Sequence, residues 1–406
     1  MREKPAASHD QWTLIRRARQ LITLHGPSGP RRGAAMNELG IFNDGAVLIH
    51  HGAVIEAGPS RRIENLAPAR IAREIDASGK LVLPAFVDPD AVLVLPPPAS
   101  SLEFEARREI PLKVLSRHRL EKSAGCAAAE LARYGILSVG AHTRNAFDLR
   151  DAVKVLRVQQ RLQSKPLRIR SVFSPQRFPV PNVVIESWIP AIRRSKLASI
   201  VELPAGAQEG APAPEQLSAI ALASANLGLS LRLRSASPLD PTGYELATRA
   251  GAIAVIAPPG AGRECFHQPG DSGCVHVVPA VTGLRQDGEY VGGGRRIIDE
   301  GNAVALSSGY QTDGISSFNP QFLIYLAVER FGLTPEEAIT AATWNAACSL
   351  RLAHVAGSIE PGKFADVVIM DAPDYRELPR RVGHNDVLQV MHAGETVYQR
   401  GALTLD

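Results

Sequence analysis

The sequence has few cysteines and no long apolar run. Its four cysteines are scattered along 406 residues, too few for a disulfide framework, so we expect a reducing compartment. No stretch reaches the roughly 18 consecutive apolar residues that a membrane-spanning helix needs, and the charged N-terminal segment lacks the apolar core of a signal peptide. We therefore expect a cytoplasmic protein with no membrane partner.

The chain also has little net charge and few aromatic residues. It carries 45 Lys and Arg against 41 Asp and Glu, a formal net charge of +4, so nucleic-acid binding would need a concentrated basic face. Paired arginines are scattered along the chain, and aromatics, at 5% of residues, do not interleave with them. Nucleic acid is therefore not an expected partner. Eleven histidines leave metal binding and acid–base chemistry open.

Both ends of the chain have sequence patterns that are typical of β-strands. Near the start, apolar runs at residues 46–49 and 53–55 flank a His-His-Gly turn, which predicts a hairpin. Near the end, residues 364–371 and 387–397 are strand-like, with a turn at Ala393-Gly394. Neither end has enough strands to bury a sheet face alone. We predict that they combine into one small β-sandwich domain.

Between the ends, strands and helices alternate. Apolar residues of segment 147–162 follow a helical stripe, Thr334-Pro335 with Glu337 forms a capping box, and Asn319-Pro320 is a similar helix start. Eight strand candidates are present, at residues 81–87, 136–139, 168–173, 199–203, 230–234, 253–256, 275–278 and 303–307. This alternation predicts an α/β fold with a (β/α)8 TIM-type barrel, whose chemistry belongs at the carboxyl ends of the strands.

The predicted organisation is one barrel and one composite β domain. We assign residues 1–80 to the N-terminal part of the β domain, residues 81–355 to the barrel and residues 356–406 to the C-terminal part of the β domain. The length of the chain fits a barrel of the usual roughly 250 residues plus a smaller unit.

Several segments resemble the amidohydrolase superfamily and, within it, the imidazolonepropionase family. LPAFVDP at 83–89 and GSIEPGKFAD at 357–366 carry the general superfamily pattern. Narrower matches are LITLHGPSGPRRG (21–33), NELGIFNDGAVLI (37–49), GLTPEEAITAATWNAA (332–347) and DAPDYRELPRRVGHN (371–385). The resemblance implies the barrel with its composite β domain and a homodimer. It also implies an ancestry among enzymes that open the imidazolone ring in histidine degradation.

The metal ligands of that family are replaced in this sequence. Members hold one Zn or Fe through a His-x-His after the first barrel strand, a His ending the fifth and an Asp ending the eighth. These positions fall on Asp90 and Val92, on Arg234 and on Gly309. Valine and glycine offer no side-chain donor, and a guanidinium is not deprotonated in proteins. The resemblance therefore implies a homologue with no metal cofactor and no hydrolase activity.

Arginines stand at two of the vacated positions. Leu231 and Leu233 alternate with polar residues, so Arg234 is predicted to face the barrel interior, where it must be paired. Asp90, which the resemblance places across the mouth, is the predicted partner. Arg177 falls on a further family histidine position after the third strand. Two interpretations stay open, a structural ion pair and a small carboxylate ligand bound by Arg234 and Arg177; for Arg177 alone the alternative is a solvated loop residue.

The second hypothesis is an active hydrolase of C–N bonds in cyclic amides. It would use relocated Zn or Fe ligands, such as His142 after the second strand and Asp313 near the end of the eighth, or no metal. These two residues are fewer than the three protein ligands that a catalytic zinc usually has.

One Cys/His cluster occurs in the chain. Residues two apart on a strand share a face, so two Cys-x-His pairs would supply a tetrahedral zinc site. Structural zinc sites more often use Cys-x2-4-Cys spacing, and the second histidine is equally explained as a buried strand residue. The members of the cluster are Cys265, His267, Cys274 and His276.

Overall fold

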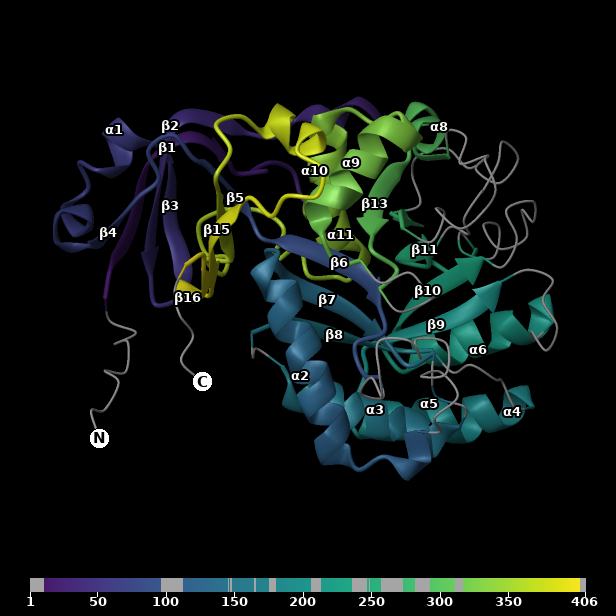
Figure 1. Cartoon of the computed structure of the whole chain (residues 1–406). Helices are drawn as coiled ribbons and strands as arrows, with labels where there is room; N and C mark the ends of the chain where they lie inside the picture. The colour runs from purple at the N-terminus through teal and green to yellow at the C-terminus, as the bar shows by residue number, and fades with distance from the viewer. Residues whose placement is uncertain are drawn as a thin grey trace, which may run out of the picture.

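Two β-sheets organise the chain in the computed structural model, which Figure 1 shows. The structure describes residues 11–95, 112–144, 146, 148–163, 166–174, 180–205, 213–235, 247, 249–256, 273–281, 293–310 and 317–401. Within these ranges, every helix is too short or too polar to cross a membrane.

The first sheet is a barrel of eight parallel strands that follow one another in sequence order (Figure 1). The strands are β6 (Phe86–Ala91), β7 (Ile136–His142), β8 (Arg168–Phe173), β9 (Ile200–Ala205), β10 (Ser230–Ser235), β11 (Ala254–Ile256), β12 (Val275–Pro279) and β13 (Ala303–Ser307). The first and last strands approach at the Ala91–Tyr310 bridge, where the Val92 amide also donates to the Tyr310 carbonyl at 3.0 Å. The predicted TIM-type barrel is confirmed.

Helices pack around the barrel, with two exceptions. The α-helices are α1 (Ser60–Ile63), α2 (Arg117–Arg133), α3 (Leu149–Arg161), α4 (Pro181–Val183), α5 (Ile189–Arg194), α6 (Pro214–Asn226), α8 (Gly293–Asp299), α9 (Pro320–Phe331), α10 (Pro335–Ala342) and α11 (Trp344–Ser349). The exceptions are α1, which lies against the other sheet, and α11, which packs against the cluster inside the barrel. The shorter turns are η1 (Gly33–Asn37), η2 (Ala67–Ile71), η4 (Leu112–Val114), η5 (Val184–Trp188) and η7 (Tyr375–Arg380). The capping box before α10 is present, with the Thr334 hydroxyl accepting from the Glu337 amide at 3.1 Å.

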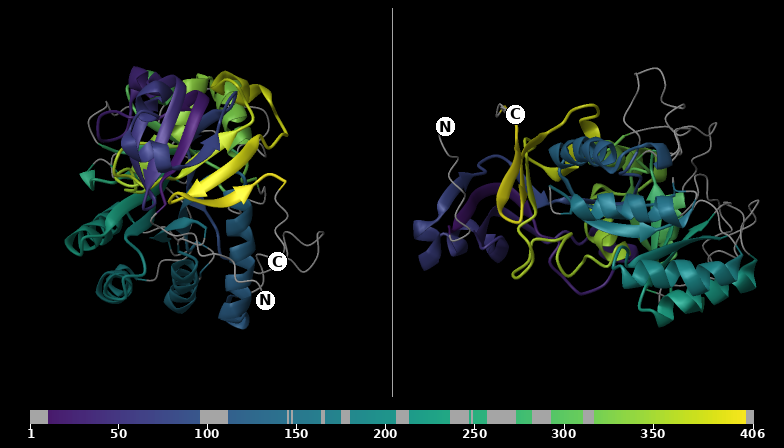
Figure 2. Two further views of the ribbon diagram at one scale, coloured as in Figure 1. Left: turned by 90° about the vertical axis from the view of Figure 1, so that its left-hand side faces the viewer. Right: turned by 90° about the horizontal axis from the view of Figure 1, so that it is seen from below.

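The second sheet joins the two ends of the chain, as the purple and yellow strands of Figure 2 show. Its order is β16-β15-β14-β5-β1-β2-β3, with β4 paired to β1. The strands are β1 (Thr13–Ile22), β2 (Ile41–His50), β3 (Ala53–Pro59), β4 (Arg73–Asp76), β5 (Leu81–Pro84), β14 (Val367–Met370), β15 (Val387–His392) and β16 (Glu395–Gln399). The predicted hairpins and the composite domain are confirmed. We call these eight strands the end sheet.

One predicted strand was wrong in its bounds. Residues 81–87 form two strands, because β5 pairs with β1 and β14 in the end sheet while β6 starts the barrel at Phe86. The chain changes sheets at Ala85, whose amide donates to the Asp366 carbonyl at 2.9 Å. Every residue of the run is apolar and buried. The hydrophobic pattern therefore does not indicate where β5 ends and β6 begins. The barrel therefore begins later than residue 81.

Buried apolar residues form separate layers that fix which side chains face the barrel interior. Leu231 and Leu233 of β10 belong to the large cluster between the strands and the helices. Ile200 of β9 and Val275 of β12 belong to a smaller cluster within the barrel. Because successive strand residues point to opposite faces, the residues that alternate with the outward leucines of β10 point into the barrel.

Candidate functional site

Four charged side chains meet inside the barrel, on strands β6, β9 and β10. Arg232 and Arg234 alternate with the outward leucines of β10, so both guanidinium groups point inward. Glu202 lies at the matching register of β9, opposite Arg232, and Asp90 is on β6. We call these four residues the mouth cluster.

Glu202 bridges both arginines. Its Oε2 accepts from Arg232 Nε at 2.7 Å and its Oε1 accepts from Arg234 Nε at 2.9 Å. The Ser174 hydroxyl also donates to Oε1, at 2.8 Å. The Glu202 side chain is 1% exposed, so these charge-assisted hydrogen bonds replace its hydration.

Asp90 takes the second position between the same two arginines. Its Oδ1 accepts from Arg234 Nη2 at 2.5 Å and from Arg232 Nη2 at 3.1 Å. The remaining Arg232 nitrogen, Nη1, donates to the Pro89 carbonyl at 2.6 Å. The predicted Arg234–Asp90 ion pair is therefore present, as one edge of a four-residue cluster.

The charges of the mouth cluster sum to zero, and its two arginines stabilise the ionised forms of its two carboxylates. Burial raises the pKa of Glu202, but the guanidinium groups of Arg232 and Arg234 outweigh it and hold that pKa well below its ordinary value. Burial likewise opposes the ionised form of Asp90, yet Arg234 and Arg232 keep its pKa lowered. Two guanidiniums and two carboxylates thus balance in a site where an unpaired charge would be costly.

His142 ends β7 beside the mouth cluster and is neutral. Burial lowers its pKa to about 3. Its Nδ1 accepts from the Arg144 amide at 3.4 Å, which leaves the proton on Nε2, 3.5 Å from Asp90 Oδ1. Within the described part of the chain, His142 Nε2 and Asp90 Oδ2 are buried without a hydrogen-bond partner.

Asp88 forms a separate contact between the first and last barrel strands. The Ser308 hydroxyl donates to its Oδ2, while the amides of Ser308 and Asp90 donate to its Oδ1, each at 3.2 Å. Burial raises the pKa of Asp88 to about 6, although the Ser308 hydrogen bond acts in the opposite direction. Asp88 thus differs from Asp90, which has cations beside it.

We expect Asp88 to titrate near pH 6 in carboxyl-carbon NMR of protein labelled at aspartate. Substituting Ser308→Ala should move the pKa higher, because the hydroxyl hydrogen bond favours the ionised form. Asp76 is the internal reference, since the Ser78 hydrogen bond lowers its pKa. Because the folded pKa of Asp88 is raised, its contribution to stability is full below pH 3.8 and is lost as the pH rises through about 6. An Asp88 midpoint near 4 would contradict this.

Two of the positions that the resemblance assigns to metal ligands, Val92 and Gly309, carry no side-chain donor. Val92 is 4% exposed and lies just beyond β6. Gly309 follows β13 with φ +60°, and its amide donates to the Ser307 hydroxyl at 3.0 Å. A left-handed backbone suits glycine better than other residues. Neither position provides a side-chain atom toward the barrel mouth that would bind a cation.

Other predicted site residues are only partly within the described ranges. Arg177, Asp313, Cys265 and His267 lie outside the described residues, so their roles stay predictions. Cys274 and His276 are described and buried, and burial raises the thiol pKa to about 12 and lowers the imidazole pKa to about 4. The zinc site that they would complete, the homodimer and the cytoplasmic location also stay predictions.

Sequence reasoning missed Glu202 and did not assign a partner to Arg232. A signal was present, because Val201 and Leu203 alternate with Glu202 in β9 as the leucines alternate with the arginines in β10. Two adjacent parallel strands with inward charges of opposite sign indicate an ion pair in the barrel.

The donors beside the mouth cluster do not fit a catalytic metal. Asp90 Oδ2 is buried without a hydrogen-bond partner among the described residues, but His142 Nε2 carries the imidazole proton, since Nδ1 accepts from the Arg144 amide. Even with the other tautomer, the two residues would supply two ligands where a catalytic zinc usually has three. Asp90 is already neutralised by Arg232 and Arg234, so a dication would add uncompensated positive charge. Among the residues that the structure describes, no group of three or more His, Cys, Asp or Glu side chains is arranged to hold a metal.

Solved structures share the architecture. A triazine hydrolase variant superposes with a TM-score of 0.71 at 15% identity, covering 96% of this chain and 95% of that one. E. coli guanine deaminase superposes with a TM-score of 0.68 at 14% identity, covering 96% and 99%. At such low identity these similarities establish the fold alone.

Sequence comparisons identify the family. The model of the amidohydrolase family matches residues 287–397. An imidazolonepropionase of Brevibacillus brevis (strain 47 / JCM 6285 / NBRC 100599) is 32% identical, over 96% of this chain and 98% of the relative. One of Geobacillus kaustophilus (strain HTA426) is 30% identical with the same coverage. The chain therefore belongs to the amidohydrolase superfamily, as an imidazolonepropionase-like member.

Proposed function

We propose that this protein is an imidazolonepropionase-like homologue that has lost the metal site and the hydrolase activity of its relatives. The observation that carries the proposal is the mouth cluster. Its two arginines and two carboxylates fill, with zero net charge, the part of the barrel where the resemblance puts metal ligands. By the resemblance, Arg234 falls on the position of the fifth-strand histidine, and Asp90 on that of the first histidine.

Electrostatics supports this proposal. A metal-dependent hydrolase needs an open coordination position where the ion polarises water. Here Glu202 and Asp90 already share their lone pairs with guanidinium donors at 2.5 to 3.1 Å, and removing those donors would break buried ion pairs. In this proposal the two arginines neutralise Glu202 and Asp90, the role that a metal cation would have in a metal-dependent hydrolase.

The alternative is an active hydrolase of C–N bonds in cyclic amides. One observation favours it, since His142 Nε2 and Asp90 Oδ2 are buried without a partner in the described residues, and such atoms often bind water or an ion. A third ligand would have to come from elsewhere, such as Asp313. The two proposals differ in metal content and in turnover.

The experiment compares this protein with the Brevibacillus brevis relative after identical treatment with Zn²⁺ or Fe²⁺ and desalting. We expect no stoichiometric metal in this chain, because two donors and two cations do not hold a dication. Imidazolone propionate and other cyclic amides should not be hydrolysed, as followed by ultraviolet absorbance. Stoichiometric metal, or turnover at a rate comparable with the relative, would contradict the proposal.

A small carboxylate ligand at Arg234 is the second part of the proposal. Arg232 is fully buried, whereas the Arg234 side chain is 16% exposed, and its Nη1 donates to none of the described residues. A carboxylate would therefore reach Arg234 through its solvent-exposed part and accept a hydrogen bond from Nη1. If Arg234→Met left both the stability and every carboxylate-induced melting shift unchanged, the structural role and the ligand role of Arg234 would both fail.

A further inference from the structure

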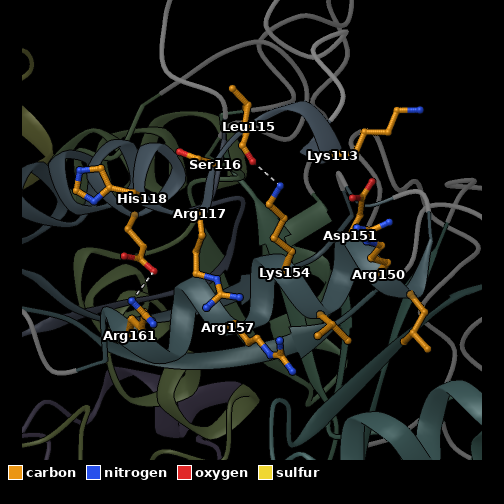
Figure 3. A pocket seen from close by; sticks show the side chains of 13 residues that line it. Lys113, Leu115, Ser116, Arg117, His118, Arg150, Asp151, Lys154, Arg157 and Arg161 are labelled. Carbon is orange, nitrogen blue, oxygen red and sulfur yellow. Dashed lines mark hydrogen bonds and ion pairs between the residues drawn. The ribbon is translucent and has the colours of Figure 1, made fainter.

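A large pocket lies in the helical layer, away from the mouth cluster. It has a volume of about 1080 Å³ and is formed by η4, the first turns of α2 and one face of α3. Figure 3 shows Arg117, Arg150 and Arg157 among the side chains that line it. None of the four mouth-cluster residues contributes to its wall.

The pocket wall is strongly basic. Six lysine or arginine side chains face two carboxylates, Glu121 and Asp151. This excess of four positive charges equals the formal net charge of the whole chain, +4. The remaining charges of the chain therefore sum to zero, and the described lining of this pocket carries a local excess of positive charge. Such focusing attracts anions.

Four cations share one face of α3. Arg150, Lys154, Arg157 and Arg161 follow the spacing i, i+4, i+7 and i+11, which stacks them along one side of the helix. Like charges at these spacings repel one another and destabilise a helix. The sequence retains this repulsion along the whole pocket wall, where an anion would relieve it.

Intramolecular contacts satisfy only part of this charge. Arg161 pairs with Glu121 at 3.3 Å, and Lys154 Nζ donates to the carbonyls of Leu112 and Leu115 at 2.6 and 2.5 Å. The two contacts of Lys154 join α3 to η4 and to Leu115 just after it.

Three guanidinium groups of the pocket wall have no ion pair within the described part of the chain. Arg117, Arg150 and Arg157 form no ion pair with the described residues, and Arg117 Nε is buried without a hydrogen-bond partner among them. A guanidinium presents paired N–H donors that match phosphate oxygens. The wall therefore offers three forks from two helices.

The spacing of these forks indicates the class of ligand. Arg150 and Arg157 are seven residues apart, roughly 10 Å along the axis of an α-helix. A chain of two or three phosphates spans that distance and can contact both guanidinium groups at once. Among the described residues that line the pocket, His118 is the one aromatic side chain, so this part of the lining has few of the stacking surfaces that single-stranded nucleic acids use.

We propose that the pocket between α2 and α3 binds a small polyphosphate through Arg117, Arg150 and Arg157. The anion neutralises the cationic face of α3 and joins it to the start of α2. This site is independent of the proposed loss of hydrolase activity.

The test uses the full chain and sodium tripolyphosphate as the probe, measured by calorimetry and by thermal shift. Sulfate at the same ionic strength is the reference for general salt effects. We expect tripolyphosphate to raise the melting temperature and sulfate not to. In the double variant R150Q/R157Q the affinity should fall about tenfold for each lost guanidinium contact. Both side chains are exposed, so the variant should fold.

The matched control is R193Q/R194Q, which removes two exposed arginines from α5 and leaves the pocket intact. It changes the net charge equally and should retain the affinity. An equal loss of affinity for tripolyphosphate in both double variants would show that only the net charge of the protein matters, and would overturn the proposed site. Unchanged binding in R150Q/R157Q would do the same. Tighter binding of a short single-stranded RNA than of tripolyphosphate, lost in R150Q/R157Q, would overturn the ligand class.

Discussion

Substituting Glu202→Gln is expected to destabilise the protein by about 3–5 kcal/mol, the usual cost of removing one partner from a buried ion pair. The glutamine keeps the shape of the side chain, but two guanidiniums then share the single charge of Asp90. Urea unfolding followed by circular dichroism measures the loss. Unfolding at the wild-type urea concentration would show that the mouth cluster is not stabilised by its charge balance.

Two further variants isolate the charge from the packing. Glu202→Leu combined with Arg232→Met removes one charge of each sign and leaves Arg234 paired with Asp90, so most of the stability should return. Glu56→Gln is the surface control, because Glu56 pairs with Arg62 at 3.0 Å where the side chains are 33% and 53% exposed. Its effect should stay within about 1 kcal/mol.

Acid should weaken the wild-type protein through the same residues. The folded pKa of Glu202 lies well below its ordinary value of 4.5, so its contribution is present above that pH and is lost as the pH falls through the lowered value. Glu202→Gln lacks this group. The difference in stability between wild type and variant should therefore shrink as the pH falls below about 4.5.

Substituting Asp366→Asn is expected to cost about 3–5 kcal/mol as well, because it leaves a buried arginine unpaired. Asp366 accepts from Arg168 of β8 at 2.5 Å, and from the imidazole of His392 and the amide of Ala393 at 2.9 Å each. It therefore links the barrel to the end sheet. Calorimetry should detect a lower melting temperature, with the two parts unfolding less cooperatively.

Asp371→Asn is the matched control for this link. Asp371 also pairs with two cations, Lys80 at 2.5 Å and Arg400 at 3.2 Å, but its side chain is 41% exposed. All three of these residues belong to the end sheet or its turns. The control should lose no more than about 1 kcal/mol and should keep a single transition. Equal losses in both variants would contradict the linking role of Asp366.

Local sequence patterns predicted the helices and strands of the fold. They did not predict most of the ion pairs between residues that lie far apart in the sequence. The capping box at Thr334 is encoded within four residues, and strand alternation indicated that Arg234 points inward. Glu202 and Arg232 lie 30 residues apart on neighbouring strands. No local pattern specifies which of many charges will meet, because strand register and barrel closure decide it. Asp90 was found only because the resemblance placed it at the mouth.

The position of β5 affects how the protein folds during synthesis. β5 pairs with β1 on one side and with β14 on the other, and roughly 280 residues separate the partners Pro84 and Val367. At about 5–20 residues per second, the ribosome needs roughly 15–60 s to make that span. During this time the backbone groups along one edge of the apolar strand β5 are unpaired and can bind other chains. The nascent protein thus depends on its last strands to protect a sheet that its first strands began.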